Sequence, residues 1–140
     1  LYASQVSQGE ESALSLRVYG TKAGLEWKQE HPNHLTVRAN DAPIRVYSRG
    51  HGPLCDAAAH ATRLPSGHPE GYPDAFANIY ANAIRVMTAR LSGTAADPLD
   101  HDFPSPEDGA RGIHFINCAL ESAKTRSWVN ARYSGPTMAS

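Results

Sequence analysis

The spacing of apolar residues changes once along the chain, and the change falls in residues 63–80. Before this stretch, apolar and polar residues alternate, which indicates strands with one buried face. After it, apolar residues recur every three or four positions, which indicates amphipathic helices. The stretch itself is a loop rich in proline and glycine that leads into a helix N-terminus, where unpaired N–H groups favour polar ligands. The sequence therefore predicts an α+β fold with its best candidate site at this junction.

The alternating region predicts an open-faced, mainly antiparallel sheet. The turns between its apolar segments are too short for a parallel crossover, so neighbouring strands must run in opposite directions. The expected strands are residues 2–7, 14–19, 25–28, 35–39 and 44–47.

The polar face of this sheet has two interpretations, a solvated surface or an oligomer interface. It is expected to carry Arg17, Tyr19, Glu26, Lys28, Arg38, Arg45 and Tyr47. Interface cores favour Arg and Tyr, which supports a homodimer or tetramer through this face. The interface candidates are Arg17, Tyr19, Lys28, Arg45 and Tyr47.

Two long helices are expected to pack on one face of the sheet, at residues 72–92 and 106–124. Pro73 and Asp74 suit the first turn of the first helix, and Ser105 and Pro106 suit the start of the second. The apolar stripe of the first helix should cover the apolar face of the sheet. Residues 1–133 then form a single domain, with a loop and a short helix at residues 49–71. Residues 134–140 are expected to be a disordered tail.

Composition and charge exclude several classes of function. With 13 basic and 14 acidic residues the net charge is −1, which gives no electrostatic footprint for nucleic acid or an anionic membrane. No apolar run is long enough to span a bilayer and no leader pattern is visible, so a cytoplasmic protein is expected. The wide spacing of Cys55 and Cys118 favours two reduced thiols, and the alternative is a single disulfide between them.

His68, Arg63 and Tyr72 are the candidate substrate-binding residues. His68 could bond a sugar hydroxyl or move a proton, but His68 and Glu70 could equally serve only to hold the loop. Arg63 could contact substrate or form an ion pair with Glu70 or Asp74. The histidines show no convergent set of ligands, so no metal is expected, and no nucleophile elbow supports a hydrolase.

Several motifs, spread over almost the whole chain, occur in an order typical of one enzyme family. They are Ala3-Ser4-Gln5-Val6, Tyr19-Gly20-Thr21-Lys22-Ala23-Gly24-Leu25-Glu26-Trp27, Gly67-His68-Pro69-Glu70-Gly71-Tyr72, Ala75-Phe76-Ala77-Asn78-Ile79-Tyr80, Phe103-Pro104, Asp108-Gly109-Ala110-Arg111-Gly112 and Phe115-Ile116. Together they resemble the C-terminal domain of the Gfo/Idh/MocA family of NAD(P)-dependent oxidoreductases. The resemblance implies that the bare sheet face mediates dimers or tetramers and that the helix-covered face borders the substrate cleft. Such enzymes oxidise sugars, inositols and related polyols by hydride transfer to NAD or NADP.

The family's catalytic and cofactor motifs are missing from this sequence. It has neither the Gly-x-Gly-x-x-Gly unit of the N-terminal Rossmann domain nor the Lys-Pro motif that supplies the catalytic lysine. Asp56 and His60 have the spacing of the family's Asp/His pair, but they follow the strands instead of preceding them. The chain is therefore expected to be a fragment that binds no cofactor and is inactive alone. The alternative is a stand-alone binding or assembly module with the same fold.

Overall fold

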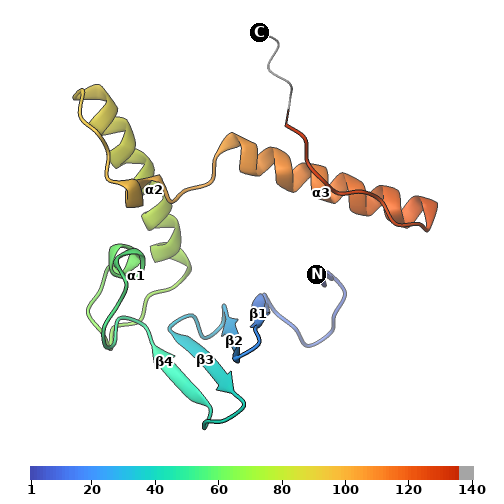
Figure 1. Cartoon of the computed structure of the whole chain (residues 1–140), viewed down its shortest axis with the longest axis horizontal. Coiled ribbons are helices and arrows are strands. Elements are labelled where there is room, and N and C mark those ends of the chain that lie inside the picture. Colours follow the sequence, from blue (N-terminus) through green and yellow to red (C-terminus); the bar gives the residue numbers. More distant parts are fainter. Residues whose placement is uncertain (136–140) are drawn as a thin grey trace. The chain divides into compact units, whose positions relative to one another are not determined.

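The computed structural model describes residues 1–135 and confirms an α+β fold with a four-stranded antiparallel open sheet (Figure 1). The elements in chain order are β1 (Ser15–Tyr19), β2 (Ala23–Lys28), β3 (His34–Ala39), β4 (Arg45–Ser48), α1 (Asp56–Ala61), α2 (Tyr72–Leu91), the 3-10 helix η1 (Pro98–His101) and α3 (Pro106–Thr125). In the described part of the chain, no helix is long and apolar enough to cross a membrane. Internal contacts divide the chain into two units, which meet within α2 between Ala81 and Asn82.

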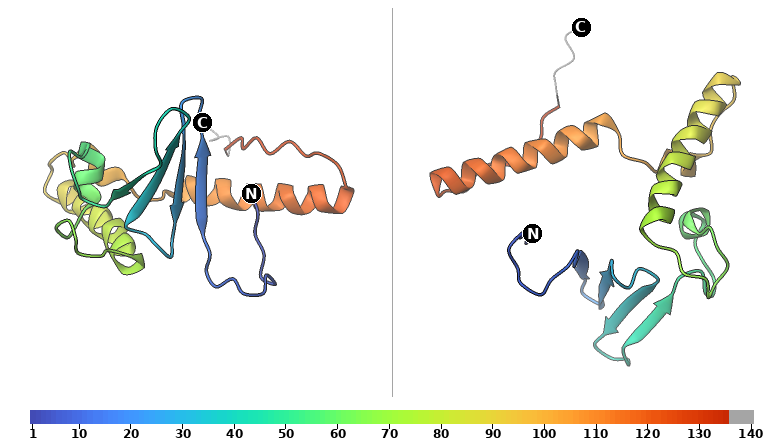
Figure 2. Two further views of the ribbon diagram at one scale, coloured as in Figure 1. Left: turned by 90° about the horizontal axis from the view of Figure 1, so that it is seen from below. Right: turned by 180° about the vertical axis from the view of Figure 1, so that it is seen from behind.

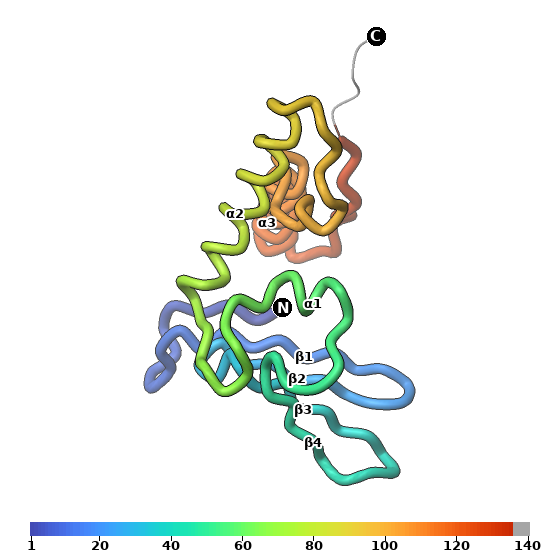
Figure 3. The backbone as a smooth tube through the Cα atoms, turned by 90° about the vertical axis from the view of Figure 1, so that its left-hand side faces the viewer, coloured from blue at the N-terminus to red at the C-terminus, as the bar shows by residue number. Residues whose placement is uncertain are grey.

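The sheet of the first unit is an antiparallel meander in the order β1-β2-β3-β4 (Figures 2 and 3). Each strand pairs with the next in sequence, as the short turns predict. The strand expected at residues 2–7 is wrong, because this segment has no regular secondary structure. Strand β1 pairs with β2 alone among the described strands, so residues 2–7 add no strand to the sheet despite their alternating pattern.

The register of the strands decides which side chains share a face. Residues directly opposite each other on paired strands point to the same side of a sheet. The polar sheet face consists of Ser15, Arg17, Tyr19, Gly24, Glu26, Lys28, His34, Thr36, Arg38, Val46 and Ser48. The apolar sheet face consists of Leu16, Val18, Ala23, Leu25, Trp27, Leu35, Val37, Ala39, Arg45 and Tyr47.

Two of the residues expected on the polar sheet face lie on the other side. Tyr47 is opposite Leu35 and Arg45 is opposite Val37, so both belong to the apolar sheet face. The polar character of Arg45 and Tyr47 suggested the wrong side, because a shift of one residue in the register of β4 exchanges its two faces.

No apolar side chain of residues 1–135 is fully buried. Along α2, the side chains of Phe76, Ile84 and Met87 are 43%, 57% and 56% exposed. The helix passes from the first unit to the second after Ala81, so only its first half belongs to the same unit as the sheet.

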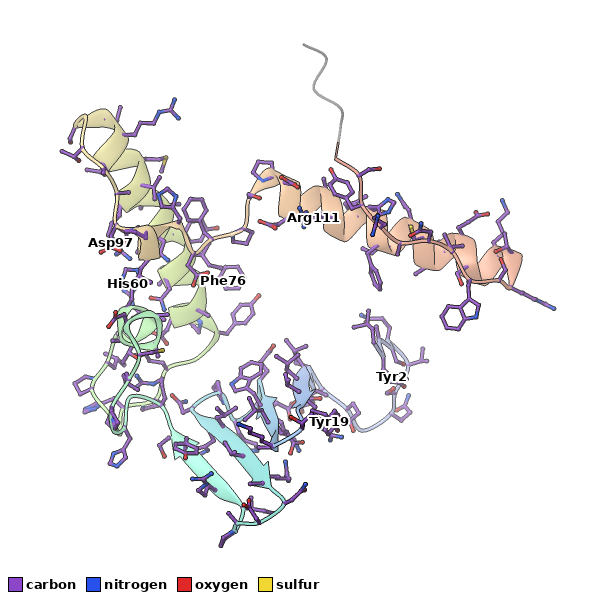
Figure 4. All side chains as sticks on the ribbon, in the orientation of Figure 1. Tyr2, Tyr19, His60, Phe76, Asp97 and Arg111 are labelled. Carbon is purple, nitrogen blue, oxygen red and sulfur yellow. The ribbon has the colours of Figure 1, made fainter. Side chains whose placement is uncertain are left out.

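A buried polar cluster connects α2 to η1 in the second unit. Asn82 and Asp100 are both buried. The Asn82 amide donates to the carbonyl of Asp102 (3.1 Å), and Arg85 Nε donates to Asp100 Oδ1 (2.5 Å). Asp97 caps η1 by accepting from the backbone N–H of Leu99, and its place is labelled in Figure 4. No helix was expected between residues 92 and 106, so η1 is an addition.

Helix α3 begins as the sequence predicts. Ser105 is the N-cap, Pro106 follows it, and Ser105 and Asp108 form a reciprocal capping box. After the helix, the chain returns along α3 (Figure 1). There the Tyr133 ring lies 5.6 Å from that of His114 and 5.8 Å from the Arg111 guanidinium. Of the tail expected to be disordered, residues 136–140 lie outside the described part of the chain.

Lowering the pH is expected to loosen the first turn of α3. Hydrogen bonds from the Ser105 hydroxyl and backbone N–H hold the pKa of the Asp108 carboxyl below its usual value. A lowered folded-state pKa means that the carboxylate stabilises the folded state at neutral pH, and that this contribution is lost as the pH falls through that pKa. Carbon-13 chemical shifts of Glu107 and Gly109, followed from about pH 6 to about pH 3, measure the change. Ser105→Ala should weaken this pH dependence, and an unchanged dependence would contradict the assignment.

Candidate functional site

The loop before α2 is organised by the carboxylate of Glu70. This side chain is only 8% exposed, and its Oε1 accepts from the backbone N–H groups of Arg63 (2.7 Å) and Leu64 (2.5 Å). The guanidinium of Arg49 forms an ion pair with the same oxygen at 2.9 Å. A buried charge is tolerated when it is paired and hydrogen-bonded, and Glu70 meets both conditions.

Arg49 holds the same loop from its other side. It follows β4 directly, so the sheet fixes the position of its backbone. Its guanidinium donates to the carbonyl oxygens of Leu64 (3.1 Å), Pro65 (3.2 Å) and His68. A planar guanidinium presents several N–H groups in a fixed fork, which allows one side chain to fix several points of a loop.

Asn33, in the turn between β2 and β3, completes this network. Its amide donates to the carbonyl of Glu70 (2.8 Å), and its Oδ1 accepts from the Glu70 backbone N–H (2.9 Å) and from Arg49 Nε (3.0 Å). We call Asn33, Arg49 and Glu70 the loop network. It attaches residues 63–70 to the sheet through buried or half-buried polar groups.

The loop contains a tight turn that only glycine fits well. His68 N–H donates to the carbonyl of Pro65 (3.2 Å), and Gly67 has a φ of 87°. A side chain at this position would strain the backbone, because the left-handed region is costly for other residues. The turn leads directly to Glu70 and the start of α2.

Helix α2 begins at Tyr72, as predicted. The Asp74 carboxylate accepts from the backbone N–H of Gly71 (2.9 Å), which places an acidic group in the first turn. One turn of helix separates Tyr72 from Phe76, and their ring centroids are 4.7 Å apart. Phe76 is labelled on α2 in Figure 4.

These aromatic rings border a hollow in the first unit, which we call the aromatic hollow. Its volume is about 430 Å³, within the range of small-molecule sites. Trp27 of β2 forms part of its wall, and its indole N–H donates to the carbonyl of Pro32 (3.0 Å). The lining residues are Trp27, Gln29, Pro32, Arg49, Glu70, Gly71, Tyr72, Asp74, Ala75, Phe76 and Asn78.

The three predicted substrate-binding residues have different positions. Tyr72 lines the aromatic hollow, whereas His68 and Arg63 are not among its lining residues. The Arg63 guanidinium donates to Asn78 Oδ1 (3.1 Å), and its backbone N–H bonds to Glu70, so the ion pair of Glu70 is made by Arg49 instead. The interpretation of Glu70 as a residue that holds the loop agrees with these bonds.

Sequence reasoning missed three residues that build this region, Asn33, Arg49 and Trp27. Arg49 is 21 positions from Glu70, and no local spacing connects the two. The available signal was weak: a cation directly after the last expected strand, and a tryptophan within an alternating segment. The contacts that such residues make can be recognised only when the pairing of the strands is known.

The polar sheet face carries a second hollow, which we call the basic hollow, of about 560 Å³. The Glu26 carboxylate lies 3.2 Å from Arg17 Nε, 2.6 Å from an Arg38 nitrogen and 3.9 Å from Lys28 Nζ. A hydrogen bond from Arg38 and the nearby positive charges hold the pKa of Glu26 below its usual value. Tyr19, labelled in Figure 4, also lines this hollow. The structure thus brings the interface candidates Arg17, Tyr19 and Lys28 together.

Searches against protein-family models and against curated proteins gave no match. Solved structures do match. An oxidoreductase from Sinorhizobium meliloti is 42% identical with a TM-score of 0.82, over 91% of this chain and 35% of its own. An oxidoreductase from Pseudomonas syringae is 30% identical with a TM-score of 0.77, over 91% and 35%. An inositol dehydrogenase homolog from Azotobacter vinelandii, complexed with NADH and myo-inositol, is 32% identical with a TM-score of 0.73, over 86% and 32%. The chain spans about a third of the length of these proteins.

Proposed function

We propose that this chain, which belongs to the Gfo/Idh/MocA family of oxidoreductases and corresponds to its C-terminal domain, is part of a nicotinamide-dependent dehydrogenase. The dehydrogenase would act on a sugar or cyclic polyol, and this chain would form its substrate side and an assembly surface. The observation that carries the proposal is the likeness to solved oxidoreductases over 91% of the chain at up to 42% identity. The Azotobacter vinelandii homolog was crystallised with NADH and myo-inositol, which supports a nicotinamide cofactor and a polyol for the whole enzyme.

The aromatic hollow supports a role in binding the substrate. Tyr72, Phe76 and Trp27 offer flat apolar surfaces to the C–H groups of a polyol ring, and Asn78 and Asp74 offer polar atoms to its hydroxyls. This mixture of aromatic walls and a few polar groups is typical of small-molecule sites. In this proposal the chain binds and orients the polyol. A nicotinamide cofactor held by the rest of the enzyme would supply the hydride acceptor, and a base outside this chain would take the proton of the hydroxyl.

The loop network supports the same role by fixing the position of Tyr72. A binding group must be held closely in place to contribute to orientation, and hydrogen bonds from the surrounding structure supply that constraint. Glu70, Arg49 and Asn33 connect the residues just before Tyr72 to the sheet that carries Trp27. The two walls of the hollow are therefore joined by one set of polar contacts.

The polar sheet face supports the assembly role. Arg17, Tyr19 and Lys28 lie together there, and Tyr19 is 79% exposed. We retain these three residues as the proposed interface. Arg45 and Tyr47 are on the opposite face and would not contribute to the same contact.

Titration of this chain with myo-inositol tests the proposed site. The Trp128→Phe variant leaves one indole, so the Trp27 indole N–H resonance can be followed by NMR without overlap. We expect a saturable shift of this resonance with an affinity on the order of millimolar, because only one side of the enzyme's site is present. The absence of any shift of this resonance at the highest polyol concentration in the titration would contradict the site.

Two tyrosines of α2 provide a matched pair of variants for the same titration. Tyr72 and Tyr80 are both 65% exposed, but only Tyr72 lines the aromatic hollow. Tyr72→Ala should reduce the shift at Trp27 severely, and Tyr80→Ala should leave it unchanged. Incubation of the chain with NAD⁺ and myo-inositol should produce no NADH. Formation of NADH would contradict the proposal that this chain alone has no dehydrogenase activity.

A further inference from the structure

The basic hollow has a surplus of positive charge that its one acidic residue does not balance. Arg17, Lys28 and Arg38 surround Glu26, and no other acidic residue is among those described as lining the hollow. Three cations against one carboxylate leave a local charge of two positive units. Like charges held this close on neighbouring strands repel one another, so a ligand that balances them would be attracted strongly.

The exposures show which groups a ligand could reach. The Glu26 side chain is only 11% exposed, whereas those of Arg17, Lys28 and Arg38 are 56%, 55% and 49% exposed. The carboxylate therefore lies beneath the cations and competes with a ligand for them, while the cations keep about half of their surface open. Gly24, also in the lining, adds no side chain to fill the space.

The cations have hydrogen-bonding capacity beyond their contacts with Glu26. The Lys28 ammonium is 3.9 Å from the carboxylate, which is an ion-pair distance but too long for a hydrogen bond. Arg17 contacts Glu26 through Nε and Arg38 through one terminal nitrogen, and each guanidinium carries five N–H donors in all. Guanidinium groups match the oxygens of phosphate in spacing and direction.

We propose that the basic hollow on the polar sheet face is a binding site for a phosphate-class dianion. Its two negative charges equal the surplus charge of the cluster, and its several oxygens can accept from Arg17, Lys28 and Arg38 together. The site is separate from the aromatic hollow and does not depend on polyol binding.

The test uses inorganic phosphate as the probe, added to the chain near pH 7.5, where it is largely a dianion. Backbone amide shifts of Gly20 and Gly24 are followed by NMR, with sodium chloride of equal ionic strength as the reference. We expect saturable shifts with phosphate only. Shifts that do not saturate, or that chloride reproduces, would overturn the proposal.

Two variants should change the affinity for phosphate in opposite directions. Arg38→Gln should weaken phosphate binding about tenfold, because a hydrogen bond to a charged group is lost. Glu26→Gln should strengthen it about tenfold, because the competing carboxylate is removed and the surplus charge rises. Arg111→Gln, an exposed arginine of α3, should leave binding unchanged. Weaker or unchanged binding by Glu26→Gln would overturn the proposal, as would an equal loss in Arg38→Gln and Arg111→Gln.

Discussion

Replacing Glu70 by alanine is expected to release the loop before α2 and to lower the free energy of unfolding of the first unit by about 3 kcal/mol. The change removes the acceptor of two backbone N–H groups and the only ion-pair partner described for the Arg49 guanidinium, and the Arg49 side chain is only 17% exposed. Removing one partner of a buried ion pair costs far more than removing an exposed one, because the remaining charge stays out of water.

Hydrogen exchange provides the sharpest measurement of this effect. The amides of Arg63 and Leu64 should exchange about a hundredfold faster in Glu70→Ala, since they lose their acceptor and the loop opens locally. Glu70→Gln keeps one carbonyl oxygen but loses the charge, so its effect should be intermediate. Urea unfolding gives the corresponding change in stability.

Glu107→Ala is the matched control for Glu70→Ala. Glu107 also pairs with an arginine, Arg111 at 2.6 Å, but both side chains are about 60% exposed. Such pairs contribute less than about 1 kcal/mol, so this variant should unfold almost like the unchanged chain. Equal effects of the two substitutions would mean that burial of the loop network does not matter, which would contradict its role.

The elements of the fold could be predicted because each depends on local chemistry. Turn residues separate the alternating segments that became β1 to β4, and Ser105 with Pro106 marks the start of α3. Residues 2–7 show the limit of this reasoning. They alternate as a strand should, but a strand also requires a partner, and no residue within the segment reveals one.

The faces of the sheet could be predicted only in part. Arg17, Glu26 and Lys28 share a face as expected, because the β1–β2 hairpin keeps its register. Arg45 and Tyr47 are on the other face, since the register of β4 depends on how residues 40–44 turn. Polarity alone does not settle the register of an exposed edge strand.

The candidate site shows the same division between local and long-range information. The start of α2 at Tyr72 could be predicted, because a helix start is visible in the sequence. The partner of Glu70 was not, because Arg49 approaches it from the end of β4, and Arg63 is much nearer in sequence. Residues that meet through strand pairing leave no spacing pattern to detect.

We expect a second large effect when a residue of the polar sheet face is substituted, because this face is the proposed assembly surface. Tyr19 and Tyr47 are both exposed tyrosines of the sheet, but Tyr19 is on the polar sheet face and Tyr47 on the apolar one. Tyr19→Glu would bury a new charge in the proposed contact and should dissociate the assembly. Tyr47→Glu makes the same chemical change on the opposite face and should leave the mass as it was.

Light scattering of the unchanged chain and these two variants tests the central claim most directly. We predict that the unchanged chain has the mass of a dimer or tetramer of the 15.1 kDa unit. Tyr19→Glu should have the mass of one chain, and Tyr47→Glu should keep the assembled mass. A monomeric unchanged chain would contradict assembly by this domain alone. Dissociation by Tyr47→Glu but not by Tyr19→Glu would place the interface on the apolar sheet face and contradict the account.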